Sequence, residues 1–443
     1  MSRNSIKTLM STGALIALSS TAYAAMGNAP SNVGLLPGDV ASAQAMSIFN
    51  SQASAVYYNP AALVYDSRGE MSAALMHVRH DLNYTDGTGG PSSGTVQDDP
   101  SQQIMLGLKT NISSMTTINH PIYVALMVSS EKYGREMLAY DSQTSSEPQY
   151  LEYSRHPLFL TVGGATKLWR GINLGASVQV NLSNSATLDT GLVLNGQTYH
   201  EDLDISAENK YRPIVGLTVN WGDTFCSDDC WLKNLDTAFS YRGYSYTQTS
   251  VAATTNVYQL ISTTLAVNNV IDAYQPDTYS VGVRYNFGRM RVALTGEYQA
   301  WSDLTHRLEH DTIKDQAVTA GNLDFKDIVV PRLGIEYDLS KNFTLISGVA
   351  WEPSALDGDR SKDVNYIGAD RWVFGLGFQA TVEHPIVLAH PLTIGFGWQH
   401  QELSSETYNL SYTDPQTGAS NAPRQVTTDG SSDAFVGSIT LKF

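Results

Sequence analysis

Apolar and polar residues alternate along most of this chain, in short segments separated by Gly, Asn, Asp, Ser and Pro. A period of two predicts β-strands with one apolar face, and about fourteen segments have it. The expected strands cover residues 68–84, 102–113, 121–131, 157–167, 171–182, 213–222, 234–246, 276–287, 290–300, 328–338, 342–351, 371–381, 390–401 and 433–443. Strands of this kind predict an all-β protein, either a sandwich or a barrel.

The connections between the expected strands alternate between long and short. Residues 132–156 form a long connection and residues 168–170 the next, short one; residues 302–327 precede the two-residue turn Ser340-Lys341 in the same way. Barrels of the bacterial outer membrane have short periplasmic turns and long external loops. The order therefore favours a membrane-spanning antiparallel β-barrel of about fourteen strands over a soluble sandwich.

Individual strands have the two faces that a barrel in lipid needs. In the strand at 276–287 we expect Tyr279, Val281 and Val283 to face lipid, with Thr278 and Ser280 inside. The last strand repeats the pattern: Phe435, Ile439, Leu441 and Phe443 share one side, and Ala434, Ser438, Thr440 and Lys442 share the other. Both strands place their larger apolar side chains on a single face.

The same alternation places charged side chains of three neighbouring strands on one interior wall, namely Arg284, Arg291, Glu297, Arg332 and Glu336. Each arginine would cost about 2–4 kcal/mol if it faced lipid at mid-depth, so we assign it to the lumen. Two interpretations remain open. The wall is either a polar contact for a substrate headgroup or a plug, or a set of paired charges that fills the lumen.

Composition narrows the class of protein. The formal net charge of −16 argues against nucleic acid as a partner, because phosphate binding needs clustered Lys and Arg. Mean hydropathy is slightly negative, and beyond the N-terminus no apolar run approaches the ~18 residues of a spanning helix. Many Tyr, Trp and Gly residues with few charges are typical of a membrane barrel.

The N-terminus has the three zones of a secretory signal. Arg3 and Lys7 are basic, residues 9–18 are apolar, and residues 22–24 are the small-residue end Ala-Tyr-Ala. The apolar zone is shorter than the roughly 20 residues that a retained membrane anchor needs. We therefore expect residues 1–24 to be a signal peptide and the rest of the chain to be exported.

The two cysteines, Cys226 and Cys230, stand close together in the stretch CSDDC. In an oxidising compartment they can close a small disulfide loop. A zinc site would need further Cys or His ligands nearby, and none are close. We expect a disulfide here, no metal site and no cofactor.

Residues 54–66, SAVYYNPAALVYD, are apolar and nearly uncharged but follow neither helix nor strand periodicity. With residues 51–53 they resemble the hatch signature of the FadL outer-membrane transporters, which import long-chain fatty acids and hydrocarbons into Gram-negative bacteria. Further matches are GEYQAWSD at 296–303, PRLGIEYDL at 331–339, GVAWEPSAL at 348–356 and the terminal Phe443.

The resemblance implies a fourteen-stranded barrel, residues 67–443, with residues 25–66 folded into its lumen as a plug. It assigns hatch and gating roles to Tyr57, Tyr58, Asn59, Pro60 and Ala61. Pro60 lacks an amide donor that would need a partner, and Asn59 supplies side-chain hydrogen bonds at the bend. The alternative is a periplasmic linker, although linkers usually hold more charge than this segment does.

The family's function would make this chain an outer-membrane channel for fatty acids or related hydrocarbons. Expected partners are a hydrophobic small molecule, outer-membrane lipid and lipopolysaccharide, and the barrel-assembly machinery acting through the strand that ends at Phe443. The family's lateral exit lies near its third strand, which is here residues 121–132. A self-plugged barrel would work as a monomer.

Two long connections carry patterns of their own. In residues 247–275, Leu260, Thr264, Val267, Ile271 and Tyr274 recur at alternating steps of four and three residues, flanked by the apolar Val257, Ile261 and Val270, which predicts an amphipathic helix. Its apolar face would either form a docking groove for substrate or cap the barrel. Residues 183–212 instead predict a hairpin around Asn195-Gly196.

Two other functions compete with this one. A general porin for small polar solutes would have a water-filled lumen, with neither an apolar plug nor a free apolar loop. A barrel enzyme would need a nucleophile and a base near one rim, and the chain has no Gly-x-Ser-x-Gly and no His-Glu-x-x-His motif. We therefore expect a channel for hydrophobic molecules and no enzymatic activity.

Overall fold

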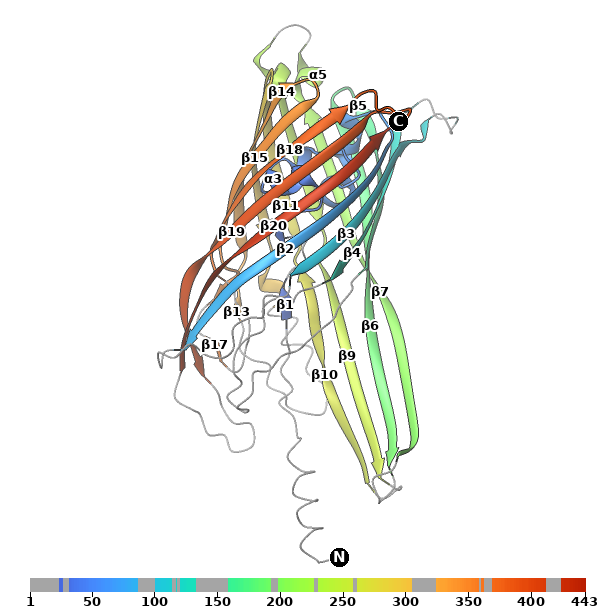
Figure 1. Cartoon of the computed structure of the whole chain (residues 1–443), viewed down its shortest axis with the longest axis vertical. Coiled ribbons are helices and arrows are strands. Elements are labelled where there is room, and N and C mark those ends of the chain that lie inside the picture. The colour runs from blue at the N-terminus through green and yellow to red at the C-terminus, as the bar shows by residue number, and fades with distance from the viewer. Residues whose placement is uncertain are drawn as a thin grey trace, which may run out of the picture.

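The computed structural model describes residues 24–26, 32–86, 100–113, 117, 120–132, 158–192, 198–226, 230–257, 261–304, 324–357, 360–361, 369–411 and 424–443. Within these residues the dominant feature is one large, mostly antiparallel sheet that closes on itself (Figure 1). No helix in the described part of the chain is both long and apolar enough to cross a membrane.

Fourteen strands form the closed ring, and each pairs antiparallel with its two neighbours. In ring order they are β2 (Glu70–Asp86), β3 (Ser101–Asn111), β4 (Ile122–Lys132), β5 (Leu158–Trp169), β6 (Ile172–Leu192), β7 (Thr198–Asn220), β8 (Leu235–Arg242), β11 (Thr278–Phe287), β12 (Met290–Gln299), β14 (Ile328–Ser340), β15 (Phe343–Glu352), β18 (Arg371–Val382), β19 (Leu392–Ser411) and β20 (Arg424–Lys442). Pairing of β2 with β20 closes the ring. The expected fourteen-stranded barrel is confirmed.

The antiparallel order places the short connections, such as residues 288–289 and 341–342, at one end of the barrel. The C-terminus lies at the same end, at the top of Figure 1, with α5 (Trp221–Phe225). Beside α5 is the short helix η4 (Trp231–Asn234), and the disulfide between Cys226 and Cys230 joins the two, as the sequence predicts. Short turns at one end match the loop order of an outer-membrane barrel.

The outer face of the ring is apolar, whereas its inner face carries polar side chains at many positions. Val281 on β11 is 56% exposed and Ile439 on β20 is 57% exposed, whereas Ser280 and Thr440 are buried inside. The sequence places these residues on the same faces. Because the side-chain period of a strand is two, the lipid and lumen sides could be assigned without the fold.

Two hairpins continue beyond the barrel at the opposite end. The first is formed by the outer halves of β6 and β7, and its antiparallel pairing up to Leu192 and Thr198 confirms the expected hairpin. The second joins β9 (Ser245–Val257) and β10 (Ile261–Gln275), and β9 also pairs in parallel with β6. The short strand β1 (Ala24–Met26) adds to β10 (Figure 1).

The amphipathic helix expected at 247–275 is therefore wrong. Ile261, Val267, Ile271 and Tyr274 lie in the strand β10, and Leu260 lies outside the described residues. Thr, Val and Ile are frequent in this stretch and favour strands, and the neighbouring strand β9 offers a continuous pairing edge. The apolar steps of three and four residues were a weaker signal than strand pairing.

The N-terminal segment consists of short helical turns inside the ring. These are α3 (Pro37–Ala41), η1 (Ser47–Phe49), α4 (Ala55–Tyr58) and η2 (Pro60–Tyr65). In Figure 1, α3 lies within the cylinder of strands. Smaller pieces of structure are the pair β13 (Asp324–Phe325) with β16 (Leu356–Asp357), and β17 (Arg360–Ser361) beside β19.

Candidate functional site

Residues 32–66, called here the hatch, pack against the inner face of the barrel on several sides. The α3 turn contacts β18 and β19, and η2 contacts β5, β6 and β7. At two points of close approach between the hatch and the barrel, the barrel residue is glycine. A Cβ at Gly348 would overlap the backbone carbonyl of Ser42, and a Cβ at Gly216 would overlap the side-chain amide oxygen of Asn59. The missing side chains let the hatch backbone approach the wall.

Barrel side chains satisfy the carbonyl groups that the irregular hatch backbone leaves unpaired. Ser177 donates to the carbonyl of Val56 at 2.5 Å and Thr295 to that of Ala45 at 2.8 Å. Lys109 donates to the carbonyls of Ser51 and Asp66 at 2.8 and 2.7 Å, and Gln399 to those of Val33 and Val40 at 3.1 and 3.2 Å. Buried carbonyls need such donors, so the polar residues inside the barrel hold the hatch.

The Asn59-Pro60 bend is fixed by the asparagine side chain. Its amide oxygen accepts from the Ala61 amide at 3.2 Å, and its amide nitrogen donates to the Ile48 carbonyl at 3.0 Å. Pro60 then begins η2, where a missing N–H has no cost. The rings of Tyr57 and Tyr58, just before the bend, meet edge to face at 5.0 Å. All five residues assigned to the hatch lie buried at its centre; their gating role stays a prediction.

Asp39 lies fully buried within the hatch. Its carboxylate accepts hydrogen bonds from the Leu36 amide at 3.0 Å, the Ser47 hydroxyl at 2.7 Å and the Asn50 amide at 3.2 Å. Burial outweighs these bonds and raises the pKa of Asp39 above its ordinary value of 3.8. The carboxyl therefore organises the first half of the hatch, and its protonation is coupled to the folding of the hatch.

The pH dependence of stability tests this coupling. Because the pKa of Asp39 is raised on folding, the folded chain keeps a proton that the unfolded chain releases above pH 3.8. This stabilising contribution is complete below pH 3.8 and is lost as the pH rises through the folded pKa. We therefore expect the melting temperature of the original protein to fall as the pH rises through the folded pKa of Asp39, and this fall to be absent in Asp39→Asn. The loss of the bond to Leu36 lowers the melting temperature of the variant at every pH. An unchanged slope in the variant would contradict the assignment.

One wall of the lumen, called here the apolar wall, is lined by hydrophobic side chains. Met76 on β2, Met105 on β3 and Met127 on β4 all point inward and are buried. They belong to one hydrophobic cluster with hatch residues, among them Val56 and Leu63. Met side chains are flexible and adapt to differently shaped apolar partners. This wall can therefore hold the hatch or, if the hatch moves, an apolar ligand.

The opposite wall is charged, and the five expected charged residues all lie on it in two groups. Toward the short turns, Arg291 pairs with Glu336 at 2.7 Å and with Asp338, and Arg284 pairs with Asp236 of β8 at 2.8 Å. The Arg284 guanidinium also lies 4.8 Å from the centre of the Phe49 ring in the hatch. These contacts support the paired, space-filling interpretation for this group.

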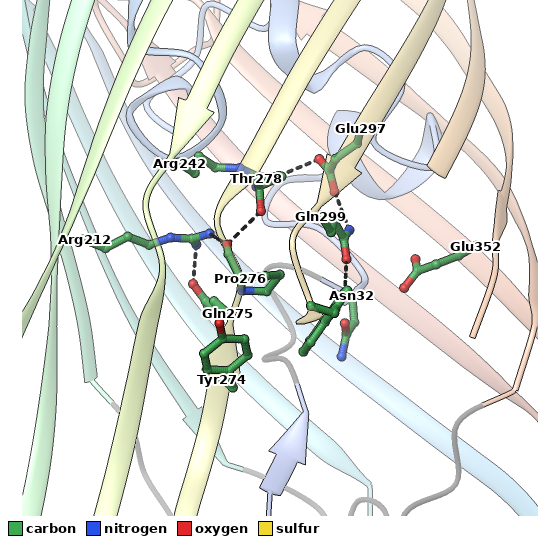
Figure 2. Close-up of a pocket in the computed structure, with 11 residues that line it drawn as sticks. Asn32, Arg212, Arg242, Tyr274, Gln275, Pro276, Thr278, Glu297, Gln299 and Glu352 are labelled. Carbon is green, nitrogen blue, oxygen red and sulfur yellow. Dashed lines mark hydrogen bonds and ion pairs between the residues drawn. The ribbon is translucent and has the colours of Figure 1, made fainter. Parts of the chain in front are cut away.

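The second group, called here the arginine cluster, lies deeper and touches the hatch. Arg242 bonds Glu297 at 2.5 Å, and Arg332 lies 3.6 Å from the other oxygen of Glu297 while donating to the Ala43 carbonyl at 3.1 Å. Arg212 donates to the carbonyls of Gly243 and Pro276 and to Gln275. Figure 2 shows Arg212, Arg242 and Glu297 around a common cavity.

The sequence analysis did not include Arg212 and Arg242 among the lumen charges. Arg242 ends β8, and its partner Glu297 is on β12, two strands away around the ring. The inward parity of β7 and β8 would have placed both arginines in the lumen. The alternation of inward and outward side chains, applied to every strand, is the sequence signal that could have found these two arginines.

Two cavities flank the arginine cluster, and both are small. One, lined by Arg212, Tyr274, Trp301 and Glu352 among others, has about 20 Å³ of room for water-sized molecules. The other, between the hatch and the wall, has about 10 Å³. A single water needs roughly 10–15 Å³ on this scale. Neither cavity can hold an alkyl chain while the hatch is in this position.

The remaining expectations concern the route through the wall. Strand β4 contains the expected exit region, and its pairing with β3 and β5 runs without a register shift over the described residues. Tyr274, expected in a free helix, is instead buried with its ring 5.6 Å from that of Trp301. The described part of β4 therefore contains no break in pairing that would mark an exit.

Comparison with known proteins adds three findings. A family model described as outer membrane protein transport protein (OMPP1/FadL/TodX) matches residues 13–443. Alkane uptake protein A of Marinobacter nauticus is 42% identical over 433 residues, which cover 96% of this chain and 94% of that protein. A Pseudomonas aeruginosa FadL homologue of known structure superposes with a TM-score of 0.60 at 12% identity, covering 92% of this chain and 98% of that chain.

A second solved structure gives the same result. The toluene transporter TodX of Pseudomonas putida superposes with a TM-score of 0.55 at 14% identity, covering 93% of this chain and 99% of that chain. At these identities the two superpositions show a shared fold.

Proposed function

Because this chain belongs to the OMPP1/FadL/TodX family of outer membrane transport proteins, we propose that it is an outer-membrane channel that takes up hydrophobic molecules past its hatch. The observation that carries the proposal is the apolar wall of β2, β3 and β4 facing a hatch buried inside the barrel. Because the members of this family are outer membrane transport proteins, this chain is a channel of a Gram-negative outer membrane rather than a barrel enzyme.

We propose a long, neutral aliphatic hydrocarbon as the substrate. The relative that is 42% identical is named for alkane uptake. Arg284 and Arg291 are already bound by carboxylates of the barrel, and the cavity beside Arg332 has no room for the alkyl chain of a carboxylic acid. Each buried methylene contributes about 0.8 kcal/mol, so an alkyl chain can be held along the apolar wall without a headgroup contact.

Movement of the hatch is the step that this proposal requires. The two cavities at the arginine cluster, both lined by described residues, have room for water-sized molecules and not for an alkyl chain. Many of its contacts with the wall are single hydrogen bonds from side chains such as Ser177 and Thr295 to hatch carbonyls, which water can replace one by one. Displacement would expose Met76, Met105 and Met127 to the ligand.

A general porin is the alternative, and the contents of the lumen argue against it. A polar solute would need a water-filled passage, but the hatch and the apolar wall share one hydrophobic cluster. The direct test is uptake of labelled hexadecane by cells producing this chain, compared with conductance of salt and sugar through the purified protein in bilayers. Hexadecane uptake without conductance supports the proposal; conductance without uptake supports the porin.

Making the apolar wall polar should reduce uptake. In Met105→Gln with Met127→Gln, two amides replace the thioethers that would contact the chain, and the desolvation of each costs about 1–3 kcal/mol. We expect hexadecane uptake to fall about tenfold or more, with the amount of protein in the membrane measured alongside.

The matched control is Met105→Leu with Met127→Leu. These changes keep the wall apolar and nearly conserve volume, so uptake should stay within about twofold of the original protein. Equal uptake by the Gln and Leu variants would mean that the ligand does not pass along this wall.

The remaining assignments belong to the same proposal. Residues 1–24 would be removed as a signal peptide, residues 25–66 would serve as the plug and residues 67–443 as the barrel. The closed ring is self-contained, which supports a monomer in outer-membrane lipid and lipopolysaccharide. The backbone of Phe443 pairs with Gly69 at the seam of the ring, a position that suits a terminal strand read by the barrel-assembly machinery.

A further inference from the structure

The arginine cluster contains more positive than negative charge. Arg212, Arg242 and Arg332 are all buried, and Glu297 is the carboxylate that lies between the last two. Glu352 approaches Arg332 only to 4.0 Å and is held at 2.5 Å by a further arginine, Arg371. Four guanidinium groups therefore share two carboxylates, and an unbalanced buried charge is costly.

Asp39 of the hatch does not restore the balance by direct contact. Its hydrogen bonds go to Leu36, Ser47 and Asn50, all within the hatch. The surplus of positive charge is therefore concentrated on the barrel side of the hatch.

Several guanidinium N–H groups of the cluster make no hydrogen bond. Nε of Arg332 and Nε of Arg242 are buried without one, and Nη2 of Arg332 faces the carboxylates of Glu297 and Glu352 only at 3.6 and 4.0 Å, beyond hydrogen-bond distance. An unsatisfied buried donor costs about 1–3 kcal/mol, and more when it is charged. Three such groups on two neighbouring arginines indicate a missing acceptor.

Both arginines line the smaller cavity, between the wall and the hatch. The hydroxyl groups of Ser47, Ser280 and Thr295 in the same lining already donate elsewhere, to Asp39, Glu297 and the Ala45 carbonyl. Gln44, Tyr58 and the carboxylate of Glu297 also line this cavity, and Gln44 and Tyr58 have partners of their own. The guanidinium N–H groups without a hydrogen bond are the donors that a guest would meet. With about 10 Å³ of room, the cavity admits one particle of roughly the size of water.

We propose that Arg242 and Arg332 bind one small inorganic anion, such as chloride, between the hatch and the barrel wall. The anion would accept the unpaired N–H groups and offset the surplus charge. Because Arg332 also donates to the Ala43 carbonyl of the hatch, the bound anion would stabilise the hatch in its observed position. The inference does not depend on which hydrophobic molecule the channel carries.

The size of the cavity separates a free anion from the headgroup of a substrate. Both would present the same chemistry, an anionic acceptor, to the guanidinium groups. A carboxylate carries an alkyl chain, for which the closed cavity has no room. A free halide should therefore bind while the hatch is closed, and a fatty acid should not.

The test measures the melting temperature of the purified full-length protein in mild detergent with sodium chloride, sodium bromide or sodium gluconate at equal ionic strength. We expect chloride and bromide to raise the melting temperature by several degrees, with saturation, and the bulky gluconate to have no such effect. Crystals grown with bromide should show an anomalous diffraction peak between Arg242 and Arg332.

The variant Arg332→Gln should lose both the halide dependence and the bromide peak. Arg291→Gln is the matched control, because Arg291 is also a lumen arginine but is fully engaged by Glu336 and Asp338. Its halide dependence should remain. If Arg332→Gln does not fold, the presence or absence of the bromide peak in the original protein shows by itself whether a halide binds between Arg242 and Arg332.

Two results would overturn the proposal. A melting temperature independent of halide, with no bromide peak, would mean that the cavity holds only water. Stabilisation by a long-chain fatty acid in halide-free buffer, with displacement of bromide, would assign the site to a substrate headgroup. Neither result would affect uptake of hexadecane, so failure here is distinguishable from failure of the proposed function.

Discussion

A disulfide between the hatch and the barrel wall is expected to stop uptake. A Cβ at Gly334 on β14 would lie 3.6 Å from the Cβ of Ser42 in the hatch, within the ~3.5–4.5 Å that disulfides span. The double variant Ser42→Cys, Gly334→Cys should therefore form the bond in an oxidising compartment. Because the covalent bond removes displaced positions of the hatch, hexadecane uptake should fall about tenfold or more.

Reduction is the internal control of this experiment. A membrane-permeant reductant should restore uptake in the double variant, and each single variant should transport with or without it. The single variant Gly334→Cys also measures any cost of crowding against Ala45, whose Cβ lies 2.9 Å from the added atom. If the oxidised and reduced double variants transport equally well, the hatch does not need to move.

Adding a side chain at Gly348 is expected to force the hatch from its seat. Its Cβ would overlap the Ser42 carbonyl, which is backbone and cannot rotate away. Overpacking of this kind usually costs about 1–3 kcal/mol. In Gly348→Val we therefore expect a lower melting temperature and, because the lumen is no longer filled, a higher ion conductance than that of the original protein.

The same substitution on the lipid face provides the control. At Gly437 on β20 nothing lies within 4 Å of an added Cβ, so Gly437→Val should leave both stability and conductance close to those of the original protein. A Gly348→Val protein that stays closed and equally stable would show that the hatch contacts the wall less tightly at this point. The pair of variants separates the effect of the hatch from that of glycine replacement in a strand.

Much of the barrel could be predicted from the sequence because its signals are local. Alternation assigns Val281 to the lipid face and Ser280 to the lumen from their neighbours alone, and a strand keeps this parity wherever it pairs. Cys226 and Cys230 are so close in the chain that their partnership needs no knowledge of the fold. The residues of the hatch stood out because their apolar run has no period.

The sequence patterns gave wrong or incomplete predictions where the structure depends on pairing between segments far apart in the chain. The apolar steps in 261–275 resemble a helix, but β9 and β6 provide strand edges that only the assembled barrel brings there. The arginine cluster was predicted only in part for the same reason. Glu297 and Arg332 were expected on one wall. Arg242 and Arg212 join them from other strands, and alternation along a strand does not give the position of that strand in the ring.

The sequence by itself determined the fourteen strands, their two faces and the ends at which their turns lie, because these follow from side-chain parity and turn chemistry within a few residues. Tertiary structure alone decided which glycines the hatch rests on, which charges neutralise one another and which guanidinium groups stay without a partner. Those are relations between groups far apart in the chain, such as Gly348 with Ser42 or Arg332 with Ala43, and they exist only once the ring has closed around the hatch.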